Sequence, residues 1–119
     1  MSVDLGLIRV PEGFNGMLED LPSDWGLKNI CTRKYLIAEL EKLFPKVYNA
    51  KVENAGSLLV REEKYSLEFS IGNDSIISYI TVYIRAEDLE LALKTVKHFC
   101  EILNCKAIDI QGSDFLDFN

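Results

Sequence analysis

Two stretches of the chain place apolar residues at helical spacing. The first follows Thr32, a candidate N-cap, and its stripe consists of Leu36, Ile37, Leu40, Leu43 and Phe44. Pro45 is expected to end this helix, because the residue before a proline is pushed out of the α region. The second stretch runs from about Asp88 to Leu103 with the apolar residues Leu89, Ala92, Leu93, Val96, Phe99, Cys100 and Leu103. The pattern therefore predicts two amphipathic helices, each with a single apolar stripe.

Other stretches show the two-residue period that is typical of strands. From Tyr65 to Ile71, apolar and polar residues alternate, and residues 72–75 form a turn rich in Gly, Asn and Asp. From Ile76 to Arg85, we expect one continuous strand with Ile76, Ser78, Ile80, Val82 and Ile84 on the same face. Shorter runs predict strands at residues 3–10, 57–61 and 106–110.

The remaining segments are predicted to be irregular. Residues 11–26 contain two prolines and three glycines, a density of breakers that favours a long ordered loop within the domain. Residues 114–119 are predicted to form an acidic, aromatic tail. The whole chain, 1–119, is the right size for a single domain.

These elements predict an α+β fold with a mostly antiparallel sheet of four to five strands and both amphipathic helices packed on one face. Because each helix has one apolar stripe, each covers one side of the sheet only. The other face is expected to be open, and it carries Ser66, Glu68, Ser70, Tyr79, Thr81, Tyr83 and Arg85.

The acidic charge of the chain makes some classes of function less expected. The formal net charge is −6, distributed as −4 over residues 1–24, +3 over residues 25–64 and −5 over residues 65–119. A protein that binds the phosphate backbone is expected to carry a basic excess, so direct nucleic-acid binding is disfavoured. No apolar run approaches the ~18 residues of a membrane helix, and the first ten residues do not resemble a secretory signal. Three cysteines suggest no disulfide framework, and a cytoplasmic location is the simpler expectation.

No catalytic motif, cofactor motif or metal site is predicted. The single histidine, His98, lies beside the stripe of the second helix and is expected to be a surface residue. Cys100 and Cys105 are five apart, but the chain has no C-x-x-C pair for zinc, no phosphate-binding glycine loop and no regular calcium loop. Adjacent acids such as Glu62-Glu63 are expected to be solvated or to complement a helix dipole.

The aromatic and acidic residues of the second half are the candidates for binding. Tyr79 and Tyr83 are four apart on one strand and hence share a face, and tyrosine is enriched at interfaces. The same pair is also consistent with the preference of tyrosine for strands, or with a face that the N-terminal segment covers. We predict a partner-binding surface that contains Glu68, Tyr79, Tyr83, Asp109, Asp114 and Asp117.

Three segments together resemble a known class of proteins. The stretches Leu67–Gly72, Ile80–Arg85 and Ala107–Asp117, within about residues 65–117, resemble small bacterial immunity proteins of polymorphic toxin systems, including contact-dependent growth inhibition. The resemblance implies a cytoplasmic, non-enzymatic inhibitor that binds one cognate toxin domain. An acidic inhibitor would suit a basic toxin such as a nuclease, because it can imitate the phosphate backbone.

Three functions stay open from the sequence. The first is a toxin-neutralising protein, as a monomer or a weak homodimer. The second is a small enzyme or ligand-binding domain with a pocket lined by Trp25, Tyr35 and Tyr65. The third is a structural module whose open sheet face pairs with a second copy of itself.

Overall fold

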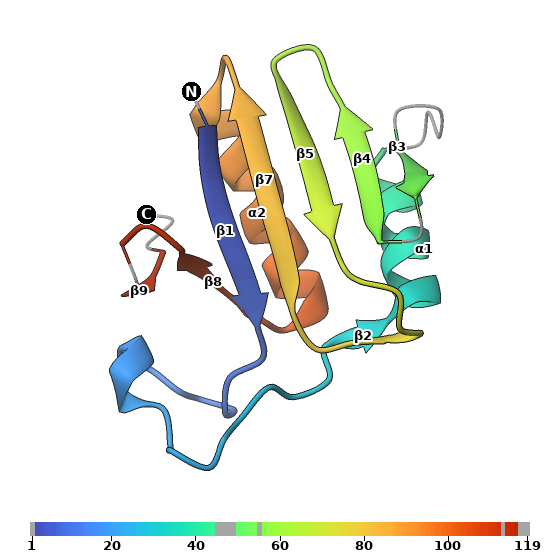
Figure 1. The fold of residues 1–119 in the computed structure, drawn as a ribbon. Coiled ribbons are helices and arrows are strands. Elements are labelled where there is room, and N and C mark those ends of the chain that lie inside the picture. The colour runs from blue at the N-terminus through green and yellow to red at the C-terminus, as the bar shows by residue number, and fades with distance from the viewer. Residues whose placement is uncertain (1, 45–49, 55, 113, 117–119) are drawn as a thin grey trace.

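The computed structural model describes residues 2–44, 50–54, 56–112 and 114–116. Within them, one sheet contains seven strands in the order β3-β4-β5-β7-β1-β8-β9, and every neighbouring pair is antiparallel (Figure 1). The strands of this sheet are β1 (Ser2–Ile8), β3 (Ala50–Asn54), β4 (Ser57–Arg61), β5 (Tyr65–Ser70), β7 (Ile80–Ala86), β8 (Lys106–Asp109) and β9 (Asp114–Phe115). A separate two-stranded sheet pairs β2 (Cys31–Thr32) with β6 (Ile76–Ile77). The helices are η1 (Leu18–Asp20), α1 (Arg33–Leu43) and α2 (Leu89–Leu103).

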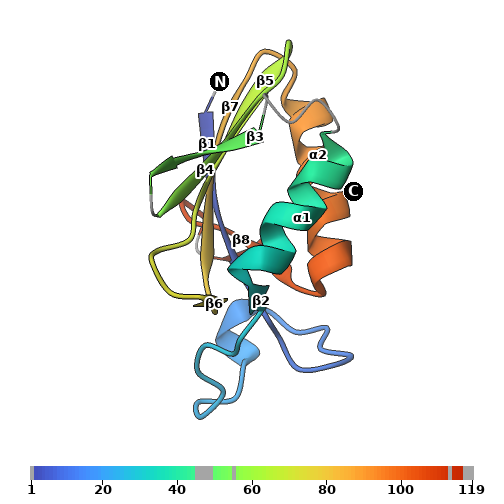
Figure 2. The ribbon, with the colours of Figure 1, turned by 90° about the vertical axis from the view of Figure 1, so that its right-hand side faces the viewer.

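Both α-helices lie on the same face of the sheet, as predicted (Figure 2). Helix α2 connects β7 to β8, and β1 lies between these two strands. Since β1 is antiparallel to both, β7 and β8 run parallel to each other. Two parallel strands must be joined by a long crossover connection. Here the connection is α2, which packs across β5 and β7. The predicted α+β class is therefore confirmed.

The core fills the space between the sheet and the two helices. Phe99 of α2 and Phe69 of β5 are both fully buried, with ring centroids 5.3 Å apart. Helix α1 contributes Leu36 and Leu40 to the same cluster of buried side chains. Burial of this apolar face is the main term that holds the helices on the sheet.

The helix boundaries follow from local chemistry. The Oγ1 of Thr32 accepts a hydrogen bond from the Tyr35 amide at 3.1 Å, so the predicted N-cap of α1 is confirmed. The Oδ1 of Asp88 caps α2 in the same way through the Leu91 amide at 3.1 Å. Asn104 ends α2 in the left-handed region with φ of 53°. Pro45, the predicted stop of the first helix, lies outside the described residues.

Several predicted strand boundaries were wrong. Seven strands, not four to five, share the main sheet in the described part of the chain, because β3 and β9 were not expected to be strands. The predicted strand at residues 76–85 is divided by a bend at Ser78 and Tyr79, and β6 leaves the main sheet to pair with β2. The bend shifts the alternation, so Ile77 is buried whereas Ile76 is half exposed. The predicted tail at residues 114–119 begins with β9, which pairs with β8.

None of the helices within the described residues is both long and apolar enough to cross a lipid bilayer.

Candidate partner-binding face

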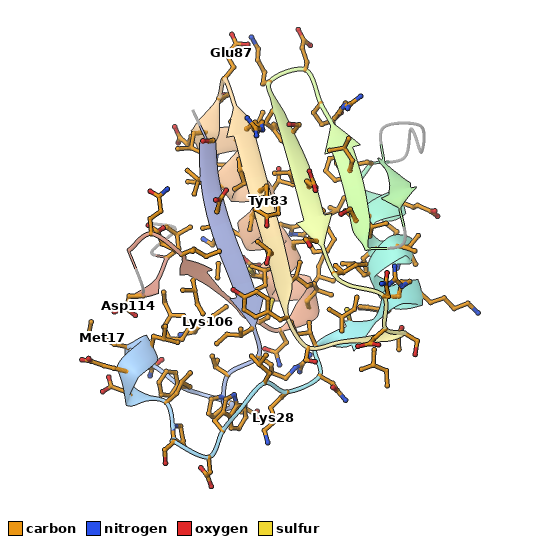
Figure 3. All side chains as sticks on the ribbon, in the orientation of Figure 1. Met17, Lys28, Tyr83, Glu87, Lys106 and Asp114 are labelled. Carbon is orange, nitrogen blue, oxygen red and sulfur yellow. The ribbon has the colours of Figure 1, made fainter. Side chains whose placement is uncertain are left out.

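The face of the sheet opposite the helices carries a set of exposed polar and aromatic side chains. In β7, Ile80, Val82 and Ile84 are buried, and the alternating residues Thr81, Tyr83 and Arg85 point to the other side. Figure 3 shows Tyr83 on this open face, in the middle of the sheet. Glu68 and Tyr83, which the sequence predicted to share a face with Tyr79, are directly opposed here, and Tyr79 lies farther along, over Gly6.

One row of side chains crosses the centre of the open face. The register places Glu68 directly opposite Tyr83 on one side and Asp4 directly opposite Tyr83 on the other. Leu59 of β4 extends the row beyond Glu68. Directly opposed residues in an antiparallel pair have Cβ atoms about 5 Å apart. Tyr83, 41% exposed, is therefore flanked by a carboxylate on each side.

A basic row runs beside the acidic one. Arg61, Ser66, Arg85 and Ser2 are opposed to one another across the same four strands. Both rows line a shallow hollow of about 690 Å³. Within the described residues, the side chains of Asp4, Glu68, Arg61 and Arg85 form no ion pair or hydrogen bond. The open face thus presents two charges of each sign that have no partner in the described part of the chain.

Tyr79 closes one end of this face by lying over Gly6. A Cβ added at Gly6 would lie 2.8 Å from the Cζ of Tyr79, and closer still to its hydroxyl oxygen. The tyrosine ring thus occupies the space that a side chain at position 6 of β1 would fill. Tyr79 stays 36% exposed, so it covers the strand and still faces outward.

The predicted acids of the C-terminal region lie elsewhere. Asp109 and Asp114 are opposed to each other in the β8–β9 hairpin. The Oδ1 of Asp114 accepts hydrogen bonds from the Leu18 amide at 3.0 Å and the Phe115 amide at 2.7 Å, and these bonds lower the pKa of its carboxyl group. The Oδ1 of Asp109 accepts from the Gln111 amide at 3.1 Å. Both carboxylates thus accept hydrogen bonds from backbone amides, and Asp117 lies outside the described residues.

Asp4, a member of this row, was not predicted from the sequence. Its position in an alternating strand was visible, but its neighbour Tyr83 follows only from the central place of β1 in the sheet. The signal that could have suggested it is the polar position of Asp4 between Val3 and Leu5.

A second hollow, of about 640 Å³, lies between the N-terminal loop, the end of α2 and the β8–β9 hairpin. Trp25 lines it, as predicted, but Tyr35 and Tyr65 do not. Tyr65 instead lines a smaller hollow of about 250 Å³ together with His98 and Thr95. The pocket expected near Trp25 and Tyr35 is therefore present at Trp25 alone.

The three cysteines are free thiols. Cys100 and Cys105 are buried, and burial together with the neighbouring Cys105 raises the pKa of Cys31 to about 11. Such a thiol is protonated at neutral pH and is a poor nucleophile. In the part of the chain that the structure describes, no group of three or more His, Cys, Asp or Glu residues is arranged to hold a metal ion.

No family model, no curated protein and no solved structure matches this chain.

Proposed function

We propose that this protein is a non-enzymatic inhibitor that binds a partner protein through the open face of its sheet, and that the partner is a bacterial toxin domain with a basic surface. The observation that supports this proposal is the row Glu68–Tyr83–Asp4, whose side chains have no hydrogen-bond or ion-pair partner among the described residues. The resemblance of residues 65–117 to immunity proteins supports the toxin as the partner and the cytoplasm as the place of action.

The central row suits a basic side chain of the partner. An arginine or lysine laid over the ring of Tyr83 would gain a cation–π contact and lie between the carboxylates of Glu68 and Asp4. A tyrosine side chain has only two rotatable χ angles, so little conformational entropy is lost when a partner covers Tyr83. Tyr79, on the same face, extends the aromatic contact area beyond the row.

The neighbouring row sets the orientation of the partner. Arg61 and Arg85 would pair with acidic groups of the partner. These groups would lie beside the basic side chain that packs on Tyr83. Opposite charges in adjacent rows fix the register of docking, since a rotated partner would meet like charges. The net charge of −6 would steer a basic partner toward the molecule, and Asp109 and Asp114 add negative charge at the adjoining edge.

The proposal is tested by co-expressing the chain with the product of the gene next to it and measuring both co-purification and rescue of growth. We expect a toxin domain that binds tightly, with Kd rising as salt is added. Tyr83→Ala and Glu68→Arg should each weaken binding at least tenfold. Glu41→Arg is the matched control, because Glu41 is an exposed acid of α1 on the helical side of the sheet.

Two results would overturn the proposal. The first is that the neighbouring product contains no toxin domain and does not bind. The second is that binding occurs but is equally strong for Tyr83→Ala, Glu68→Arg and Glu41→Arg. Light scattering adds a further check, since a stable homodimer that is broken by Tyr83→Ala would assign the open face to self-association.

A further inference from the structure

The hollow at Trp25 is walled by three aromatic rings. Phe14 comes from the N-terminal loop, and Phe115 comes from β9; their ring centroids are 6.2 Å apart with an edge-to-face angle of 70°. The ring of Trp25 is fixed because its Nε1 donates a hydrogen bond to the carbonyl oxygen of Arg9 at 2.9 Å. A volume of about 640 Å³ lies within the ~300–1,000 Å³ range of small-molecule sites.

The partly buried charges of this hollow are both positive. Arg9 donates to the carbonyl oxygens of Ile30 at 2.6 Å and Leu103 at 3.0 Å, and its buried Nε has no acceptor. The Nζ of Lys106 donates to the carbonyl oxygen of Phe14 at 3.1 Å and lies 5.3 Å from the ring centroid of Phe115. Figure 3 shows Lys106 between the hairpin that carries Asp114 and the N-terminal loop.

No described carboxylate neutralises these two cations. The acids that line the hollow, Glu12 and Glu101, are exposed and form no ion pair within the described residues. Lys97, also exposed, adds a third positive charge. Carbonyl oxygens and ring faces satisfy the donors but leave the formal charge in place. The described lining residues therefore carry one more positive than negative charge, in a protein of net charge −6.

We propose that this hollow binds a small organic anion with a flat aromatic body and a carboxylate or sulfonate group. The aromatic body packs against Phe14, Trp25 and Phe115, and the anionic group lies at Lys106 with Lys97 beside it. The site is separate from the row Glu68–Tyr83–Asp4, with which its lining shares no residue, so the proposal does not rest on the proposed function.

The experiment uses the full chain and the side-chain amide signal of Trp25, the single tryptophan of the sequence. In heteronuclear NMR, this Nε1–H gives one isolated peak that reports on the wall of the hollow. We titrate 1-naphthoate and, as a matched neutral probe, 1-naphthamide. We expect a saturable shift of the indole peak with naphthoate, and affinity at least tenfold lower for naphthamide.

Two variants separate charge from packing. Lys106→Met keeps the aliphatic stem against the phenylalanine rings and removes the charge; it should lower naphthoate affinity at least tenfold and leave naphthamide binding unchanged. Lys97→Gln changes an exposed residue and should weaken naphthoate binding about threefold, since an exposed charge is screened by solvent. Lys94→Met is the control, because Lys94 is exposed on α2 but outside this hollow.

Three outcomes would overturn the proposal. They are no shift of the indole peak at millimolar naphthoate, equal affinity for the charged and neutral probes, and unchanged naphthoate affinity in both Lys106→Met and Lys97→Gln. If the peak dispersion in the NMR spectrum shows that Lys106→Met is unfolded, the Lys97→Gln result and the comparison of the two probes still test the anion site.

Discussion

The helix-covered face and the open face of the sheet are made from alternate residues of the same strands, yet their side chains differ in nearly every physical respect. On the covered face, Val82 and Ile84 are completely buried among apolar neighbours. On the open face, Tyr83 and Arg85, which alternate with them, are exposed and lack intramolecular partners within the described residues. The covered face stabilises the fold, and we propose that the open face binds the partner.

This difference shows how a small domain can keep stability and the proposed binding on separate faces. A two-residue period assigns successive side chains to opposite sides, so a strand can serve both purposes at once. Unpaired charges and an exposed tyrosine contribute little to folding. Polar residues are ordinary on the solvent-facing side of an antiparallel sheet. Under the proposed function, a basic partner would cover them.

The largest expected contrast is between Phe99→Ala and Tyr83→Ala. Phe99 is completely buried against Phe69, and its truncation should lower the free energy of unfolding by about 3–5 kcal/mol. Tyr83 is 41% exposed, so its truncation should cost about 1 kcal/mol or less. Urea denaturation of the two variants measures both values. Similar losses for the two would contradict the division between the faces.

A smaller effect is expected at Gly6, where the open face is tightly filled. Gly6→Ala places a methyl group against the ring of Tyr79 and should cost about 1 kcal/mol, since the tyrosine end can move outward. In a Tyr79→Ser background the same change should be neutral or slightly stabilising, because alanine is favoured over glycine within a strand. A double-mutant cycle by thermal denaturation measures this coupling. Equal costs in both backgrounds would show that Tyr79 does not cover Gly6 in solution.

Neutralising the charges of the open face should barely alter stability. Glu68→Gln and Arg85→Gln are each expected to change the free energy of unfolding by no more than about 0.5 kcal/mol, because neither side chain has an intramolecular partner among the described residues. Chemical denaturation at low and high salt is the measurement. A loss well above 1 kcal/mol that disappears in high salt would mean that the two charges are paired within the free protein.

The smallest effect concerns Asp114, outside both faces. The Leu18 and Phe115 amides hold the pKa of its carboxyl group below the ordinary 3.8, so its ionised form is favoured in the folded state. This contribution is present above the unfolded pKa and is lost as the pH falls through the lower folded value. The amide shifts of Leu18 and Phe115 should therefore show a step below pH 3.8 that Asp114→Asn abolishes. A step that persists in the variant would assign it to another group.

Local features of the fold were predictable from the sequence because their causes are local. The caps at Thr32 and Asn104 depend on residues within one turn of the chain, and the alternation of β5 depends on its own pattern. The break between β6 and β7 was not predictable, since Ile76 and Ile77 are both apolar and only pairing with β2 decides which is buried. β9 is two residues long and forms because β8 offers it an edge.

Some residues of the candidate site were likewise predictable from the sequence, and others were not. Glu68, Tyr79 and Tyr83 could be placed on one face from alternation alone, but Asp109 and Asp114 could not be assigned to the hairpin that uses their oxygens. The acidic tail that composition suggested as a docking surface is, in its described part, engaged with backbone amides. On the open face, the acids without a partner among the described residues are Asp4 and Glu68, more than sixty positions apart.

By itself, the sequence determined two amphipathic helices, a mostly antiparallel sheet and one face without helices to cover it, because periodicity records which side of each element must avoid water. The tertiary structure alone decided that β1 lies between β7 and β8, that Tyr83 lies between two carboxylates, and that Trp25 meets Phe14 and Phe115 around a hollow. The physical reason is that neighbours across a sheet or a loop are selected by long-range packing and hydrogen bonding, and a period along the chain carries no record of which distant strand will be the partner.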